Sequence, residues 1–160
     1  AYGETYGLPY VISNCSNNYG PDQHSEKLIP TLIHSLQQNK ALPIYGNGSN
    51  IRDWLYVEDH IAAMNLIFHK GVLGETYLIG GRCERSNLAV ATSICRAYDA
   101  HIGQADGTAE KLITFVPDRP GHDYRYAIDP HKLESTLGWS PQTNWEVGIQ
   151  KTISSYLDKI

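Results

Sequence analysis

The sequence is poor in cysteine, and its cysteines form no pattern. Cys15, Cys83 and Cys95 are an odd number, lie far apart and include no CxxC pair. A disulfide framework or a structural zinc site needs cysteines at short, regular spacing, so neither is expected. Three reduced thiols are typical of a protein of the cytoplasm, and this is the compartment that we predict.

Positive charge and long hydrophobic segments are scarce as well. The 160 residues contain 13 Lys and Arg against 17 Asp and Glu, which gives a formal net charge of −4. A protein that binds a nucleic-acid backbone needs a basic surface. The apolar stretch 61–68 is interrupted by Asn65 and is far shorter than the roughly 20 residues of a membrane span. We therefore expect neither nucleic acid nor a membrane as a partner.

The motifs of dinucleotide binding and of common catalytic centres are also missing. The chain has no GxGxxG, GxxGxxG or P-loop, no HExxH, and none of its 11 tyrosines has a lysine four residues later. A glycine-rich turn is what lets the backbone approach a pyrophosphate. The sequence therefore predicts no metal site, no glycine-rich phosphate loop and no tyrosine–lysine pair for proton transfer within this chain.

What the sequence does contain is an alternation of strand-like and helix-like segments. With 41% hydrophobic residues, the chain is long enough to bury a core without disulfides. Loops are expected at residues 16–21, 46–50 and 118–123, which are rich in Gly, Pro, Asn and Asp. Strands are predicted for β-rich runs bounded by such turns, namely 8–14, 42–45, 51–57, 75–79, 112–116 and 124–128.

Helices are predicted where apolar residues recur at helical spacing. The first runs from Ser25 and stops before Pro43, with Pro30 tolerated in its first turn. The second begins near Glu58 and ends around Lys70.

A third helix is capped by Ser86 or Asn87 and is followed by a polar stretch, 101–110, that is expected to be a mobile loop. Two further helices are predicted near the end of the chain. One has Asp129 as its cap, Pro130 as its first residue and Gly138 at its end. The other has a capping box from Thr143 to Glu146, and its apolar stripe extends to Ile160.

Three cations stand out because they lie in loops or at a helix start. Lys27 opens a helix, Arg52 follows a Gly/Asn turn, and Arg119 is held between acidic, proline and glycine residues. Arg binds phosphate oxygens bidentately and Lys acts as a point charge, so the three suit a diphosphate if they converge. The alternative is that each is a solvated surface charge.

Each of the other candidate ligand-binding residues also has an ordinary structural interpretation. Asn17 and Asn18 follow the first predicted strand, where open parallel sheets bind ligands, but Asn is also common in turns. Tyr45 is suited to stacking on a base or to ordinary packing. His122 is suited to donating to a phosphate or to capping a turn.

Six segments occur in a recognisable order: 14–21 (NCSNNYGP), 26–30 (EKLIP), 42–46 (LPIYG), 51–60 (IRDWLYVEDH), 74–77 (GETY) and 118–123 (DRPGHD). Together they resemble the dTDP-glucose 4,6-dehydratases, and the match covers nearly the whole chain. The wider superfamily of NAD-dependent sugar-nucleotide epimerases and dehydratases seldom shares both the KLIP and the DRPGH segments, so the resemblance is specific.

The resemblance implies an α/β fold that is the C-terminal portion of a Rossmann-type extended short-chain dehydrogenase. Residues 1–24 would be a remnant of the NAD-binding Rossmann domain, with its last strand and loop. Residues 25–160 would form a small mixed α/β substrate-binding domain. The first predicted strand also lacks the strand and helix that would complete a right-handed crossover before it. We therefore expect this chain to be a fragment.

The resemblance also implies a reaction. The full enzyme would use bound NAD to oxidise C4 of the glucosyl unit of dTDP-glucose, eliminate water across C5 and C6, and return the hydride to C6. The product would be dTDP-4-keto-6-deoxyglucose. The catalytic residues would all lie upstream, so the fragment alone is expected to be inactive. A homodimer is implied for the full-length enzyme.

By the same resemblance, Asn17 would contact the nicotinamide side of NAD. The implied substrate contacts are Asn18, Arg52 and Arg119 at the diphosphate, Lys27 and Leu28 at a helix start, Pro43, Ile44 and Tyr45 against thymine, Asn87 at the nucleoside or diphosphate, and Asp118 and His122 in the loop that closes the site.

The sequence departs from the family at two places. Leu78 stands where asparagine is usual, and residues 22–25 replace a more aromatic stretch near the sugar. Two alternatives to the main interpretation remain. The first is another epimerase, dehydratase or decarboxylase of the same superfamily, and the second is a non-catalytic module that binds nucleotide sugars.

Overall fold

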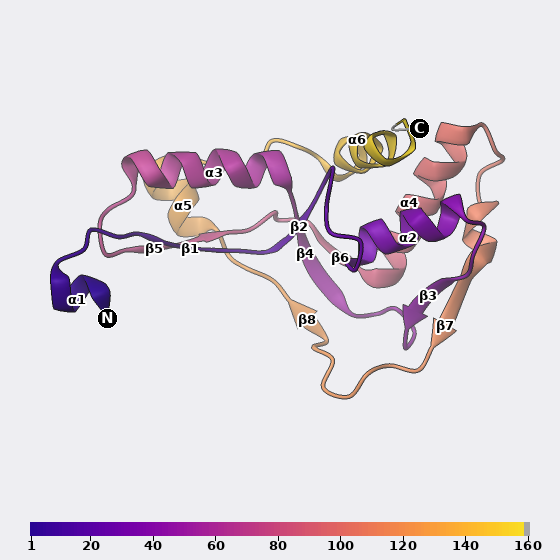
Figure 1. Cartoon of the computed structure of the whole chain (residues 1–160), viewed down its shortest axis with the longest axis horizontal. Coiled ribbons are helices and arrows are strands. Elements are labelled where there is room, and N and C mark those ends of the chain that lie inside the picture. Colours follow the sequence, from indigo (N-terminus) through magenta and orange to yellow (C-terminus); the bar gives the residue numbers. More distant parts are fainter. Residues whose placement is uncertain (159–160) are drawn as a thin grey trace.

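The buried hydrophobic residues of the chain form two separate clusters, and each organises its own group of helices and strands. The computed structural model describes residues 1–158. The two groups lie at opposite ends of an elongated molecule, with the N-terminus at one end and the last helix toward the other (Figure 1). We call them the small lobe and the large lobe.

The small lobe is built on a parallel pair of strands, β1 (Ile12–Cys15) and β5 (Thr76–Ile79). The helices α3 (Val57–Lys70) and α5 (His131–Leu137) pack on this pair, and the short helix α1 (Tyr2–Tyr6) lies beyond it (Figure 1). The buried cluster of this lobe consists of Leu55, Ala63, Ile67, Tyr77, Ile79, Leu133 and Trp139.

The opposite face of the β1–β5 pair is open. Ile12 and Leu78 lie on it and are 44% and 38% exposed. Within residues 1–158, β1 pairs with no strand other than β5. Parallel sheets are normally covered on both faces, so this face and this edge are unusual for a soluble fold.

The large lobe contains two sheets. In the first, β4 (Ile51–Tyr56) lies between β2 (Asn17–Tyr19), which is parallel to it, and β6 (Glu84–Ser86), which is antiparallel, and β8 (Arg125–Tyr126) also pairs with β4. The second sheet is a parallel pair of β3 (Leu42–Tyr45) and β7 (Ile113–Val116).

Three helices cover these sheets: α2 (Leu28–Gln37), α4 (Asn87–Ile102) and α6 (Trp145–Leu157). A 3₁₀ helix, η1 (Ala109–Leu112), packs against α4. The apolar stripe of each helix enters one cluster, in which Ile33, from α2, is fully buried. Removing this much apolar surface from water is the main force that holds the large lobe together.

Buried carboxylates fix the connections between elements. Asp53 on β4 is 1% exposed and accepts hydrogen bonds from the backbone N–H groups of Gly81 and Cys83, each at 2.8 Å. A Cβ on Gly81 would collide with the carbonyl group of Trp54, so only glycine fits there. Asp59 accepts from the N–H of Thr143 at 2.9 Å and thereby ties α3 to the segment before α6.

The predicted α/β fold class is confirmed, and several boundaries agree closely with the sequence analysis. The strands predicted at 42–45 and 51–57 are present as β3 and β4, and α3 ends at Lys70 as expected. Ser86 is the cap of α4, since its Oγ accepts from the N–H of Ala89 at 3.2 Å.

Other predictions were wrong. Residues 17–19, expected in a loop, form β2 because they pair with β4, and the unpredicted β6 forms for the same reason. The predicted loop 101–110 is partly helical, since α4 continues to Ile102 and η1 begins at Ala109.

Three helix starts also differ from the predictions. The first helix begins at Leu28 rather than at Ser25. Pro130 is the cap of α5 rather than its first residue. The cap of α6 is Asn144, whose Oδ1 accepts from the N–H of Val147 at 2.9 Å, so no capping box forms at Thr143. The predicted stripe residue Ile160 lies outside the described residues.

The structure also bears on the remaining expectations about cysteine and membranes. Cys15, Cys83 and Cys95 are all free thiols. None of the helices within residues 1–158 has both the length and the apolar character needed to cross a membrane.

Candidate functional site

A cavity of about 290 Å³ lies in the large lobe, where β2, β3, β4, the starts of α2 and α4, and the loop 118–122 meet. These segments are far apart in sequence, and pairing of β2, β6 and β8 with β4 brings most of them together. Most of the residues predicted to bind substrate or cofactor line it, namely Asn17, Leu28, Pro43, Tyr45, Arg52, Asn87, Arg119 and His122.

Arg52 joins the cavity to the loop 118–123. Its Nη1 donates to the carbonyl oxygen of Ile51 at 2.6 Å, and its Nη2 donates to the carbonyl oxygen of Asp123 at 2.9 Å. The Nδ2 of Asn50 donates to the same Asp123 oxygen at 3.2 Å. Because these acceptors are neutral, the charge of the guanidinium is left uncompensated at the cavity wall.

Arg119 and His122 both contact Tyr45. The guanidinium carbon of Arg119 lies 5.8 Å from the centre of the Tyr45 ring, and the His122 ring meets it edge-on at 6.3 Å between centroids. No carboxylate of residues 1–158 forms an ion pair with Arg119. Arg119, a cation, and His122, a potential cation, therefore lie beside the Tyr45 ring and line the same open cavity.

Asp118 does not line the cavity but supports the residues that do. Its Oδ1 accepts from the backbone N–H of Arg119 at 2.8 Å and is 2.7 Å from Nδ1 of His122. The hydrogen bond from His122 holds the pKa of the Asp118 carboxyl below its usual value, so this group stays ionised near neutral pH. Asp118 thus shapes the loop between Arg119 and His122.

The two asparagines of β2 face in opposite directions, as successive residues of a strand must. Asn17 lines the cavity. Asn18 turns away from it, and its Nδ2 donates to Sγ of Cys15 at 3.2 Å and to the carbonyl oxygen of Ser16 at 3.1 Å. Within residues 1–158, the Oδ1 of Asn18 and the Oγ of Ser16 are buried and have no hydrogen-bond partner.

Two other predicted residues lie away from the cavity. Ile44 is 1% exposed and belongs to the core of the large lobe, because strand alternation turns it away from its neighbours Pro43 and Tyr45. Lys27 is the N-cap of α2 and is exposed, and its side chain is not part of the cavity wall.

Sequence reasoning missed four residues of the wall. Thr31 and Leu32 are three and four positions after Leu28 on α2, so helical spacing from one predicted contact could have found them. Trp54 is two positions after Arg52 on β4, so strand alternation could have found it. Glu26 had no such signal. These four are the remaining wall residues, Glu26, Thr31, Leu32 and Trp54.

The electrostatic character of the cavity is cationic despite the net negative charge of the chain. Arg52 and Arg119 face it against the single carboxylate of Glu26. Asn87 is the first residue of the 16-residue helix α4, whose N-terminus favours negative charge. The arrangement can bind an anion that is attached to a flat ring.

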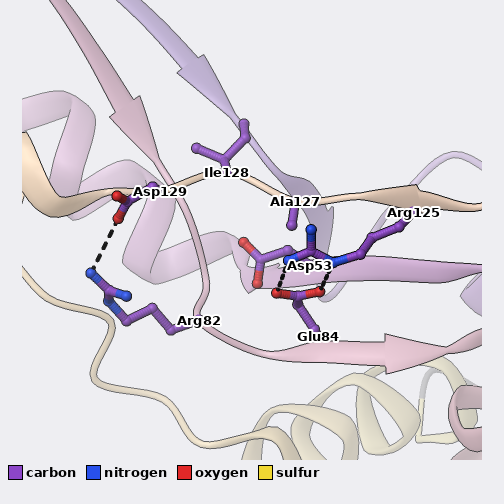
Figure 2. Close-up of a pocket in the computed structure, with 7 residues that line it drawn as sticks. All are labelled: Asp53, Arg82, Glu84, Arg125, Ala127, Ile128 and Asp129. Carbon is purple, nitrogen blue, oxygen red and sulfur yellow. Dashed lines mark hydrogen bonds and ion pairs between the residues drawn. The ribbon is translucent and has the colours of Figure 1, made fainter.

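A second cavity, of about 550 Å³, lies beside β4, β6 and β8 and has a different character. Figure 2 shows that its charged side chains point toward one another. Arg125 forms two hydrogen bonds of 2.6 Å with Glu84, and Arg82 lies 3.4 Å from Asp129. Because its arginines are already paired with carboxylates, this cavity is less suited than the first one to binding an anion.

The chain is similar to known sugar-nucleotide dehydratases. Residues 1–152 match the family described as GDP-mannose 4,6 dehydratase. A dTDP-glucose 4,6-dehydratase of Escherichia coli is 55% identical over 161 residues, which cover 99% of this chain and 44% of that protein. The chain thus spans less than half the length of this relative.

Two solved structures show the same likeness. The dTDP-glucose 4,6-dehydratase of Bacillus anthracis, in complex with NAD, has a TM-score of 0.85 and 42% identity and covers 99% of this chain and 48% of its own. The dTDP-glucose 4,6-dehydratase DesIV of Streptomyces venezuelae has a TM-score of 0.89 and 37% identity, with coverage of 99% and 47%.

Proposed function

Because the chain belongs to the GDP-mannose 4,6 dehydratase family, we propose that it forms the substrate-binding part of a dTDP-glucose 4,6-dehydratase. The full enzyme is an NAD-dependent hydro-lyase that converts dTDP-glucose to dTDP-4-keto-6-deoxyglucose and water. The observation that carries the proposal is the meeting of Arg52, Arg119 and Asn17, from three distant segments, at one cavity wall.

The diphosphate is the part of the substrate that this wall fits best. Arg52 and Arg119 supply N–H groups in a planar fork, which matches phosphate oxygens better than a single ammonium does. Charge-assisted hydrogen bonds of this kind are roughly twice as strong as neutral ones. Asn87 adds a side-chain amide and the N-terminus of α4. Asn17 completes the polar wall.

The thymine base fits the apolar side of the same cavity. Pro43 and Tyr45 are on one face of β3, and Leu28 and Leu32 are on the facing side of α2. A flat base between a tyrosine ring and aliphatic side chains removes apolar surface from water. This division of the cavity supports a nucleoside diphosphate as the ligand.

We propose that NAD is held mainly by a part of the full enzyme outside these residues. The open face and free edge of the β1–β5 pair support a larger Rossmann sheet there. Ser16, which follows β1, and Asn18, on β2, each have a buried oxygen without a hydrogen-bond partner in the described part of the chain. Such groups suit the carboxamide of a nicotinamide, which favours Asn18 rather than Asn17 for the cofactor side and Asn17 for the substrate.

We propose that the domain division at residue 24 extends to elements that follow it in the sequence. β5, α3 and α5 share their buried cluster with β1, so we assign them, with residues 1–24, to the cofactor-binding half. The substrate-binding half then comprises the elements of the large lobe other than β2. We also propose that the full enzyme is a homodimer and lies in the cytoplasm. Sedimentation equilibrium of the full enzyme tests the homodimer.

Isothermal titration calorimetry on this chain with dTDP, and with UDP as a control, tests the proposed function. We expect dTDP to bind and UDP to bind more weakly, because uracil lacks the 5-methyl group that thymine can bury against the apolar side of the cavity. Absence of binding at millimolar dTDP contradicts the proposal that these residues form the nucleotide site. Equal affinity for UDP would favour another nucleotide-sugar enzyme of the same superfamily.

A further inference from the structure

Asp118 and His122 form a hydrogen-bonded pair at the edge of the nucleotide cavity. The Oδ1 of Asp118 lies 2.7 Å from Nδ1 of His122, and the His122 side chain is only 6% exposed. The residues are four apart, and Pro120 and Gly121 (φ +70°) turn the chain between them. The loop therefore holds the imidazole in one orientation.

This contact fixes which nitrogen of His122 carries a proton. An ionised carboxylate can only accept, so Nδ1 must donate to Asp118. No hydrogen bond within residues 1–158 reaches Nε2, and the ring itself lines the cavity. In a neutral imidazole with Nδ1 protonated, Nε2 is an acceptor and would face a phosphate oxygen unfavourably. Only the imidazolium offers an anion a second N–H.

The charges around His122 favour that second proton more strongly when an anion is present. Asp118, on the same loop as His122, is negative. Arg119, also on this loop, and Arg52, on β4, are positive. Glu26 lies on the α2 side of the cavity, and Tyr45 on β3 contributes an uncharged ring. A bound diphosphate adds negative charge next to the two arginines and so removes the repulsion that they exert on an imidazolium.

We propose that binding of a nucleoside diphosphate in this cavity takes up one proton from solvent onto Nε2 of His122, with Asp118 as the positioning residue that makes this nitrogen the one protonated. The inference rests on the proposed function, because the ligand is the diphosphate of that site. No covalent bond changes. The proton comes from the buffer, and it returns there when the nucleotide leaves.

The consequence is an affinity that falls with rising pH. His122 has to gain this proton wherever the free chain holds the ring neutral, so binding becomes weaker as the proton concentration of the solvent falls. For full uptake of one proton, linkage makes the association constant fall roughly tenfold per pH unit.

Calorimetry in buffers of different ionisation enthalpy measures the number of protons taken up when dTDP binds. At pH 8 we expect uptake approaching one proton for the unaltered chain and none for His122→Gln. Asp118→Asn should lose about half or more of the uptake. Asp123→Asn is the matched control, since it removes a carboxylate of the same segment that forms no hydrogen bond within residues 1–158, and it should behave as the unaltered chain does.

A second measurement needs no nucleotide. Proton–nitrogen correlation spectra of the histidine rings at pH 8 report which nitrogen of His122 is protonated, and we expect Nδ1 in the unaltered chain and a mixture in Asp118→Asn. An Nε2-protonated ring would overturn the inference. Binding of dTDP without proton uptake would also overturn the inference, but it would leave the proposed function intact. Absence of dTDP binding at any pH overturns both.

Discussion

The guanidinium of Arg119 offers a sharp test of the proposed diphosphate site. Replacing it with lysine keeps one positive charge but removes the planar fork and its contact with the Tyr45 ring, 5.8 Å away. The residue is exposed in the ligand-free chain, and it forms no ion pair with another residue of the described part. The substitution should therefore leave the stability of the fold almost unchanged and act on binding.

The expected loss follows from the number of hydrogen bonds. A fork that binds two phosphate oxygens becomes a single contact, so one charge-assisted hydrogen bond is lost, at about 1.5–3 kcal/mol. Because Arg119 is at the rim of the cavity, the lower end applies, and about 1.5 kcal/mol corresponds to a roughly tenfold higher Kd for dTDP. Arg119→Ala also removes the charge and should approach the upper end, roughly 100-fold.

Titration calorimetry of dTDP into Arg119→Lys measures this loss directly. Arg125→Lys is the matched control, because Arg125 is also an exposed arginine but is paired with Glu84 at the other cavity (Figure 2). Its Kd for dTDP should equal that of the unaltered chain. If Arg119→Lys and Arg125→Lys bind dTDP equally well, Arg119 is only a surface charge and the reasoning about the diphosphate fails.

Three further predictions concern the fold and the loop. Asp53→Ala leaves two buried N–H groups without acceptors and should lower the free energy of unfolding by about 2–5 kcal/mol in urea denaturation, and a loss below 1 kcal/mol would contradict the role of Asp53. Burial raises the pKa of Cys95 to about 12, so a thiol reagent at pH 8 should modify Cys95 only after unfolding, and rapid modification of the folded chain would refute this. The pKa of Asp118 is lowered in the folded chain by the His122 hydrogen bond, so its stabilising effect is present above the ordinary value of 3.8 and is lost as pH falls through the lowered one. The protection of the amides of Arg119, Gly121 and His122 against hydrogen exchange, measured relative to the intrinsic exchange rate at each pH, should therefore fall only below about pH 4, and a fall already at pH 6 would contradict it.

Local signals were sufficient for some elements of the fold. β3 alternates buried and exposed side chains, and α3 has acids at its start and a lysine at its end, so both could be predicted within a residue. β2 and β6 are three residues long and polar, and they exist because β4 pairs with both. Tertiary pairing of this kind leaves no mark in the local sequence.

The candidate site shows the same limit. The residue types and the order of the motifs indicated a diphosphate, but three cations in loops do not determine which of them meet. Hydrogen bonds from Arg52 and Asn50 to Asp123 bring the loop 118–123 against β4, whereas Lys27 is not part of the cavity wall. The choice between Asn17 and Asn18 depends on the pleat of β2, which could be assigned only once that strand was known.

A structure determined from crystals of this chain soaked with dTDP tests most directly the claim that Arg52 and Arg119 bind the diphosphate. The account predicts the diphosphate within hydrogen-bonding distance of the guanidinium groups of Arg52 and Arg119, with the thymine ring against Tyr45. A nucleotide bound in the cavity of Asp53, Glu84 and Arg125, or bound with its phosphates away from both arginines, would contradict it.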